Sequence, residues 1–111
     1  MNETQFLQRI RKFLPGFFVK IHGGPMQMVG LPDLIGCWHG RFVGIELKVH
    51  PRKLTPFQEN TFENIIQAGG IAIILTLRDH QVYANKNLGA KSLVFNVDEF
   101  SKNIMVEILN L

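Results

Sequence analysis

Two acidic residues and a lysine interrupt a part of the sequence that is otherwise apolar. Asp33 lies in the apolar run 31–38, and Glu46 and Lys48 lie in the alternating run 42–49. Successive side chains of a strand point to opposite faces, so Glu46 and Lys48 share one face. Carboxylate oxygens are the ligands that Mg²⁺ takes, with water and phosphate completing its coordination. An ammonium group beside such an ion can orient a water or offset the charge of a phosphate.

The same charges have a simpler interpretation, which is a cross-strand salt bridge between Lys48 and either Asp33 or Glu46. A Glu-x-Lys tripeptide on its own favours the salt bridge, because such tripeptides are common. The Pro-Asp pair that ends at Asp33, one hairpin away, favours a binding site instead, since charged residues are rarely buried unless they are paired or used.

A hairpin is expected to bring these residues together. The segment 39–41, His-Gly-Arg, separates the two runs and contains the glycine typical of a tight turn. We therefore expect two adjacent antiparallel strands over 31–38 and 42–49. The lone cysteine, Cys37, lies in the first strand and is interpreted as a small core residue rather than a nucleophile.

A helix is predicted over residues 2–14, where apolar side chains recur at helical spacing. These side chains are Phe6, Leu7, Ile10, Phe13 and Leu14. Asn2 can cap the helix, with Gln5 three residues later, and the Pro-Gly pair at 15–16 ends it. Glu3 lies four residues before Leu7, on the inward side of the first turn. Glu3 is then either a favourable charge at the positive end of the helix or a further acid that faces the site.

A second helix is predicted from Thr55 to about Gln67 or Ala68. Thr55 is a strong N-cap, proline suits the first helical position, and Gln58 completes a capping box. Its buried side is assigned to Phe57, Phe62, Ile65 and Ile66, with Glu59 and Glu63 outward. The continuous apolar run 71–76 is typical of a strand buried on both faces, so a strand-helix-strand crossover, right-handed by default, is expected.

The remaining segments are less regular. A strand over 17–21 is followed by a glycine-rich loop, 22–30, which we expect to be mobile. After residue 77, short strands are expected over 81–84 and 93–97, followed by a helix that Asp98 caps. Its inward residues are Phe100, Ile104, Ile108 and Leu109. Apolar side chains at Ile104, Met105, Ile108 and Leu111 either complete the core or form a self-association surface.

Composition sets broad limits on the class of protein. The chain has 111 residues, 46% of them hydrophobic, which fits one domain with a packed core. The formal charge of +3 is compatible with a polyanionic partner. One cysteine allows no internal disulfide, the amino terminus is polar, and no apolar run approaches the ~20 residues of a membrane span. These features favour a reducing cytoplasm and no membrane.

Three segments in this order resemble the PD-(D/E)XK nuclease superfamily: Gly-Leu-Pro-Asp at 30–33, Ile-Glu-Leu-Lys at 45–48 and Leu-Thr-Pro-Phe-Gln at 54–58. More closely, they are similar to the virus-type replication-repair nuclease (VRR-Nuc) domain in its small, stand-alone, phage-like form. The resemblance covers residues 3–75. It implies an α/β, restriction-endonuclease-like core of order α-β-β-β-α-β with a central mixed sheet. The whole chain, 1–111, would be one domain, with the core at about 2–76 and an extension of short strands and a helix at 77–111.

The resemblance also implies a mechanism and a partner. Asp33, Glu46 and the backbone carbonyl of Leu47 would bind Mg²⁺ or Mn²⁺, and Glu3 would join them through water. Lys48 would position or deprotonate the attacking water, and Gln58 would support it. The expected activity is hydrolysis of DNA phosphodiesters, directed to branched DNA such as Holliday junctions. A homodimer would act in phage or prophage replication, recombination or repair, in a bacterium or an infected host cell.

Basic side chains near the motifs are candidates for DNA contact, either with phosphates or as a solvated surface: Lys20, His22, Arg52 and Lys53. Two other classes of protein remain open. One is a non-catalytic DNA-binding module, and the other is an interaction protein that uses its last helix. Zinc is disfavoured, because the four histidines and Cys37 lack ligand spacing. The glycine pair at 23–24 lacks the pattern of a nucleotide-binding loop.

Overall fold

The structure is a computed structural model that describes residues 1–24 and 28–111. Its elements, in chain order, are α1 (Glu3–Arg11), β1 (Phe17–Lys20), β2 (Leu34–Trp38), β3 (Arg41–Val49), α2 (Pro56–Gln67), β4 (Ile71–Arg78), β5 (Gln81–Lys86), β6 (Leu93–Asn96), the 3₁₀ helix η1 (Val97–Glu99) and α3 (Lys102–Leu109). The predicted order α-β-β-β-α-β, followed by short strands and a helix, is confirmed. The expectation of a mobile loop over 22–30 falls partly on residues 25–27, which lie outside the described residues.

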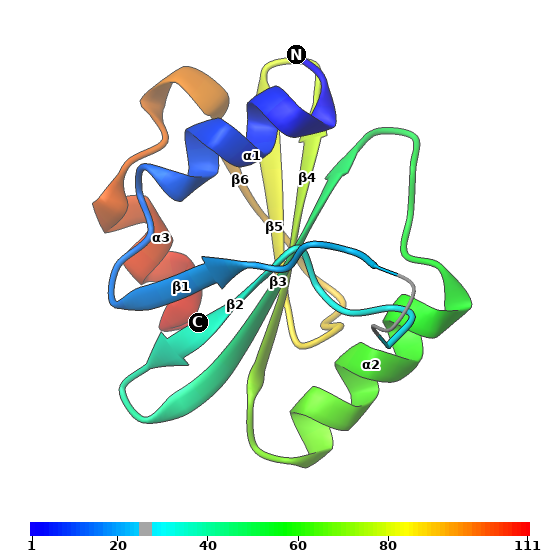
Figure 1. Cartoon of the computed structure of the whole chain (residues 1–111). Coiled ribbons are helices and arrows are strands. Elements are labelled where there is room, and N and C mark those ends of the chain that lie inside the picture. The colour runs from blue at the N-terminus through cyan, green and yellow to red at the C-terminus, as the bar shows by residue number, and fades with distance from the viewer. Residues whose placement is uncertain (25–27) are drawn as a thin grey trace.

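One six-stranded sheet organises the molecule, and its strands follow the order of the chain from β1 to β6 (Figure 1). Only β3 and β4 pair in parallel, and every other neighbouring pair in this sheet is antiparallel. The parallel pair is the one joined through α2, because parallel neighbours need a crossover connection. The predicted mixed sheet and its strand-helix-strand unit are therefore confirmed.

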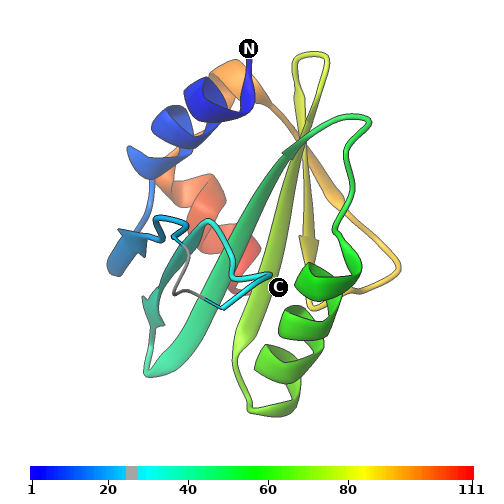
Figure 2. The same cartoon turned by 45° about the vertical axis from the view of Figure 1, so that its right-hand side comes forward.

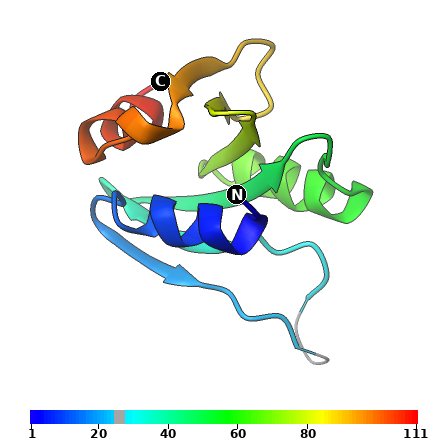
Figure 3. The same ribbon diagram turned by 90° about the horizontal axis from the view of Figure 1, so that it is seen from above.

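Helices cover both faces of the sheet: α1 and α3 lie on one side and α2 on the other (Figure 2, Figure 3). The apolar core lies on the side of α1 and α3 and includes Phe6, Ile10, Leu34, Ile45, Leu47, Ile73, Leu75, Met105 and Ile108. Strand β3 is buried on both faces from Val43 to Lys48, since the opposite side faces α2. The side chains that point toward α2 from this strand include Glu46 and Lys48, which are both buried.

The first helix begins as predicted and ends earlier. The side chain of Asn2 accepts a hydrogen bond from the backbone N–H of Gln5, whose side chain accepts one from the N–H of Asn2, so the expected capping box is present. The helix ends at Arg11 rather than Leu14. Proline at position 15 disfavours the helical conformation of the residue before it, and the last turn tightens so that the N–H of Phe13 donates to the carbonyl of Ile10 at 2.9 Å.

The hairpin of β2 and β3 is confirmed, with a two-residue turn. His39 and Gly40 both have positive φ, 48° and 78°, as the tight turns of hairpins require. Strand β2 begins at Leu34 and not at residue 31, because Pro32 has no N–H to donate to a ladder. Asp33 therefore lies immediately before the strand rather than inside it.

The second helix has the predicted N-cap, Thr55, and ends at Gln67. Phe62 is buried, whereas the prediction that Phe57 is buried is wrong, since 64% of its surface is exposed. The backbone of Phe57 lies against Gly30, where an added Cβ would come within 2.7 Å of it. Glycine offers no side chain to cover the phenyl ring, so the ring remains in solvent. Glu59 and Glu63 are exposed as expected.

The N-cap of the last helix, α3, differs from the prediction. Ser101, not Asp98, caps α3 by accepting a hydrogen bond from the N–H of Ile104. Asp98 lies within η1, and its carboxylate instead accepts a hydrogen bond from Arg9 on α1 at 3.0 Å. Of the candidate self-association residues, Met105 and Ile108 are fully buried against the sheet. Core packing therefore uses most of that apolar surface.

Cys37 is exposed, so its assignment to the core is wrong. The register places Cys37 between Phe17 of β1 and Phe42 of β3, on the face that α2 covers elsewhere. Both phenylalanines are exposed, at 67% and 46%. The end of this face thus carries a row of exposed apolar side chains across three strands.

Candidate metal centre

Strand β3 extends beyond its neighbour β2, and this overhang carries the polar residues. The pairing of β2 with β3 starts at Leu34 and Ile45, so the β3 backbone from residue 46 onward has no β2 partner. The carboxylate of Asp33 takes the place of a strand there and accepts a hydrogen bond from the N–H of Leu47 at 2.9 Å. The N–H and C=O of one residue in a strand point to the same side, so the carbonyl of Leu47 also points toward Asp33.

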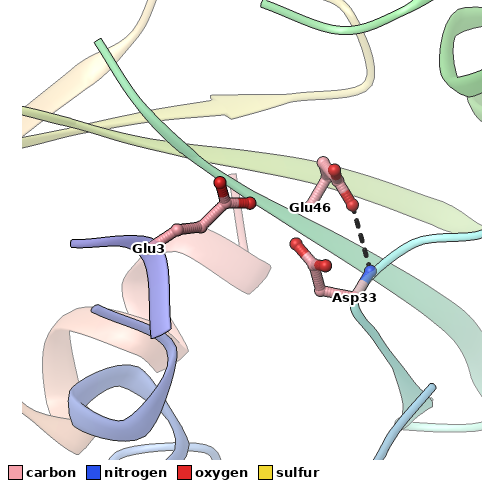
Figure 4. Close-up of side chains that lie close together, drawn as sticks. All are labelled: Glu3, Asp33 and Glu46. Carbon is pink, nitrogen blue, oxygen red and sulfur yellow. Dashed lines mark hydrogen bonds between the residues drawn. The ribbon is translucent and has the colours of Figure 1, made fainter. Parts of the chain in front are cut away.

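Three carboxylates converge beside this overhang. Glu3, Asp33 and Glu46 each offer an oxygen, and these oxygens lie within 4.8 Å of one another. They come from the start of α1, the loop before β2 and the middle of β3 (Figure 4). The backbone N–H of Asp33 donates to Glu46 at 3.1 Å and fixes two of them relative to each other. Of the two interpretations of Glu3, this geometry favours an acid that faces the site.

Glu46 is the most constrained of the three, because two side chains contact one of its oxygens. Lys48 Nζ lies 3.3 Å from Glu46 Oε2, and Gln58 Nε2 donates to the same oxygen at 2.7 Å. Glu46 and Lys48 are 3% and 2% exposed. Gln58 serves two purposes at once, since its Oε1 accepts the capping hydrogen bond from the N–H of Thr55 at 2.9 Å. Gln58 therefore completes the cap of α2 and also contacts the carboxylate cluster.

The electrostatics of this cluster favour a cation. Burial raises the pKa of the Glu46 carboxyl to about 8, and repulsion by Asp33 adds to the increase, whereas Lys48 opposes it. Without a cation, the raised pKa therefore disfavours the ionised form of Glu46. A divalent ion would favour the ionised form and relieve the repulsion between the carboxylates. The donor set, which is carboxylate oxygens with a backbone carbonyl, suits a hard ion such as Mg²⁺ or Mn²⁺.

The predicted DNA-contacting residues divide into two groups. Arg52 and Lys53 line a hollow that Lys48 also lines, and Arg52 donates to Glu3 at 3.2 Å. Lys20 lines a different hollow together with Asp33, and its ammonium donates to the carbonyl of Ile21 at 3.0 Å. His22 is exposed and follows β1.

Three residues of the hollow beside Lys48 were missed in the sequence, namely Thr76, Arg78 and Tyr83. They lie on β4 and β5, beyond the last of the three sequence motifs. The available signal was the alternation of these strands, since Thr76 and Arg78 are two residues apart and share a face. Their position relative to Lys48 depends on the register, which pairs Lys48 with Thr76 and Thr76 with Tyr83.

Comparison with models of known protein families finds no match. The chain is 30% identical over 97 residues to the acetoin utilization protein AcuA of Bacillus licheniformis. The match covers 85% of this chain and 44% of that protein, so the chain spans less than half the length of this relative.

The fold has a counterpart among solved structures. The Holliday junction resolvase Hjc of Archaeoglobus fulgidus superposes with a TM-score of 0.52 at 15% identity, and the match covers 86% of each chain. The six-stranded mixed sheet flanked by helices is thus the restriction-endonuclease-like fold that the sequence motifs predict. Within the described residues, no helix combines the length and the apolar character needed to cross a membrane.

Proposed function

We propose that this protein is a metal-dependent endonuclease that hydrolyses DNA phosphodiester bonds. One observation carries the proposal: Glu3, Asp33 and Glu46 place carboxylate oxygens within 4.8 Å of one another beside the buried Lys48. The fold shared with a Holliday junction resolvase supports the same activity. The order and spacing of the three sequence motifs support membership of the VRR-Nuc group.

The metal would be held by Asp33, Glu46 and the carbonyl of Leu47, with Glu3 completing the site. Bound Mg²⁺ or Mn²⁺ supplies Lewis acidity at the scissile phosphate and lowers the pKa of water. Asp33 is fixed for this role because its carboxylate accepts a hydrogen bond from the N–H of Leu47 and its own N–H donates to the carboxylate of Glu46, which Gln58 also holds. Held in this way, the ligands need little rearrangement when the ion binds.

Lys48 acts on the attacking water. Its ammonium is buried and lies 3.3 Å from Glu46, so it is held next to the metal ligands rather than free in solvent. From this position the ammonium orients the attacking water and offsets negative charge as the new P–O bond forms and the P–O bond to the leaving sugar oxygen breaks. Only the neutral amine of Lys48 would instead accept the proton of the water. Gln58 keeps Glu46 oriented toward the ion, and Arg52 and Lys53 neutralise phosphates of the bound strand.

The substrate we propose is branched DNA, cut by a homodimer. Resolution of a four-way junction needs two symmetric cuts, which a twofold dimer supplies. The exposed row of Phe17, Cys37 and Phe42 supports self-association, because exposed apolar patches mark interaction sites. Light scattering tests this surface: the wild type should have the mass of a dimer and Phe17→Asp that of a monomer. A monomeric wild type would remove the dimer from the proposal.

A second candidate is a DNA-binding module without catalysis. The observation that favours it is that the charges of the cluster already pair with one another. Lys48 lies 3.3 Å from Glu46, and Arg52 lies 3.2 Å from Glu3. In this case the cluster would be structural. Metal would then neither cause cleavage of the DNA nor change the affinity of the protein for it.

A cleavage assay separates the two candidates. Purified protein is mixed with labelled four-way junction, flap, single-stranded and duplex DNA, in Mg²⁺, in Mn²⁺ and in EDTA. Glu46→Ala is tested in parallel to exclude a contaminating nuclease. Metal-dependent cutting that Glu46→Ala abolishes is the expected result, with paired symmetric nicks on the junction. Binding without cutting in any metal would favour the non-catalytic module.

A further inference from the structure

A pocket of about 270 Å³ opens beside Lys48, on the side of the sheet that faces α2. Its walls come from the loop between β3 and α2 and from strands β4 and β5. The residues that line it are Lys48, His50, Pro51, Arg52, Lys53, Leu54, Ile74, Thr76, Arg78 and Tyr83. Lys48 belongs both to this pocket and to the carboxylate cluster, so an occupant of the pocket would lie next to the reaction centre.

The register explains the floor of the pocket. Lys48 pairs with Thr76, and Thr76 pairs with Tyr83, so the three side chains form a row across β3, β4 and β5. Ile74 is two residues before Thr76 on the same face and adds an apolar surface. Tyr83 is half-buried, and its hydroxyl donates to Gln81 at 3.2 Å. The floor is therefore largely apolar and carries one aromatic ring.

The rim has the opposite character. His50, Arg52, Lys53 and Arg78 are exposed and surround the opening. Among the described residues that line the pocket, none carries a carboxylate. An apolar floor with an aromatic ring suits a flat, weakly polar group, and a cationic rim suits an anion attached to that group. A nucleotide has both parts, namely a base and a phosphate.

We propose that the pocket takes one unstacked nucleotide of the cleaved strand, adjacent to the scissile phosphate. The base lies against Tyr83 and Ile74, and its phosphate meets Arg78 at the rim. The proposal rests on the proposed nuclease function, and it adds a reason for selecting branched DNA. A base inside a duplex must be unstacked and unpaired before it can enter a pocket, and this costs least where pairing is already interrupted.

The ring and the rim make separable contributions. Stacking on an aromatic side chain depends on the presence of a base, whereas a phosphate contact does not. Removal of a base from the DNA should therefore weaken binding only in proteins that keep the aromatic ring of residue 83. A hollow that holds only backbone phosphate would depend on Arg78 and be insensitive to Tyr83.

The test is a double-mutant cycle on DNA binding, measured in EDTA so that no cleavage interferes. Four-way junctions that carry a single abasic site at successive positions around the branch point are titrated with the wild type, Tyr83→Ala and Tyr83→Phe. At one position, the missing base should weaken wild-type binding about tenfold. The loss should disappear in Tyr83→Ala and persist in Tyr83→Phe, which keeps the ring.

Arg78→Ala has a matched control, Lys91→Ala, which also removes one exposed positive charge but lies away from the pocket. Arg78→Ala should weaken binding more than the control. Thermal unfolding of each variant shows whether the fold is intact. The proposal is overturned if Tyr83→Ala binds like the wild type, if its effect is equal on intact and abasic DNA, or if the protein does not bind DNA.

The binding cycle in EDTA and the cleavage assay in metal together separate this proposal from the proposed function. Failure of cleavage in metal, together with a positional effect that depends on Tyr83, would leave the pocket assigned and the nuclease disproved. Metal-dependent cleavage without any such positional effect would leave the nuclease and disprove the nucleotide pocket.

Discussion

Replacement of Glu46 by glutamine tests whether the buried carboxyl at the centre of the cluster has a raised pKa in the folded protein. The ordinary pKa of this carboxyl is 4.5, and burial raises it to about 8 in the folded protein. A folded-state pKa above the unfolded value means that the folded protein holds the proton more tightly. The stability from this group is complete below pH 4.5 and is lost as the pH rises through about 8.

The size of the effect follows from the two pKa values. One pKa unit corresponds to about 1.4 kcal/mol. Between about pH 5 and about pH 9, titration of Glu46 should lower the free energy of unfolding of the metal-free protein by roughly 4 kcal/mol. Glu46→Gln has no proton to lose at this position, so its free energy of unfolding should lack this decrease.

The assay is urea unfolding in EDTA, followed by circular dichroism across this pH range for both proteins. The difference between their pH profiles removes the contributions of groups that titrate alike in both. Saturating Mg²⁺ should restore stability to the wild type at high pH, because the cation favours the ionised carboxylate, and should restore less to Glu46→Gln. Parallel pH profiles, or a wild type that gains stability relative to the variant as pH rises, would show that folding does not raise the pKa of Glu46.

Three further predictions concern other parts of the molecule. Lys48→Ala should reduce the cleavage rate in single-turnover kinetics by about 10²–10⁴-fold, which is the usual contribution of a general acid or base. A normal rate would exclude Lys48 from the mechanism. Arg52→Ala should change the free energy of unfolding by less than about 1 kcal/mol, since its ion pair with Glu3 is largely exposed. The same variant should lower the slope of log affinity for DNA against log salt concentration by about 1, which corresponds to one lost phosphate contact. An unchanged salt slope would remove Arg52 from the DNA interface. Met105→Ala should destabilise the fold by about 2–5 kcal/mol in urea unfolding because the side chain is fully buried, and a loss below about 1 kcal/mol would place it outside the core.

The hairpin and the cluster were predictable from the sequence for a local reason. Strand alternation places Glu46 and Lys48 on one face, and the short turn brings Asp33 beside them. The caps at Asn2 and Thr55 were also predictable, because a capping box depends only on residues three apart. Each of these features is encoded within one or two neighbouring elements.

Features that depend on tertiary packing were not predictable in the same way. Glu3 reaches the cluster only because α1 crosses the face of the sheet so that its first turn lies at the β3 overhang. Cys37 was assigned to the core, but its side chain is exposed, because α2 packs mainly on β3 and β4. The pocket that Thr76 and Tyr83 line depends on the register between β4 and β5, and no motif marks it.

Whether Glu3, Asp33 and Glu46 hold a catalytic metal can be measured from the Mg²⁺ dependence of cleavage in variants of each carboxylate. Cleavage rates of a four-way junction would be measured as Mg²⁺ is increased, for the wild type, Glu3→Gln, Asp33→Asn and Glu46→Gln. Glu59→Gln is the matched control, since it removes an exposed carboxylate on the outer side of α2. We expect the control to behave like the wild type, Asp33→Asn and Glu46→Gln to lose cleavage, and Glu3→Gln to need more Mg²⁺. Wild-type rates for Glu46→Gln, or full activity in EDTA, would show that these carboxylates do not hold a catalytic metal.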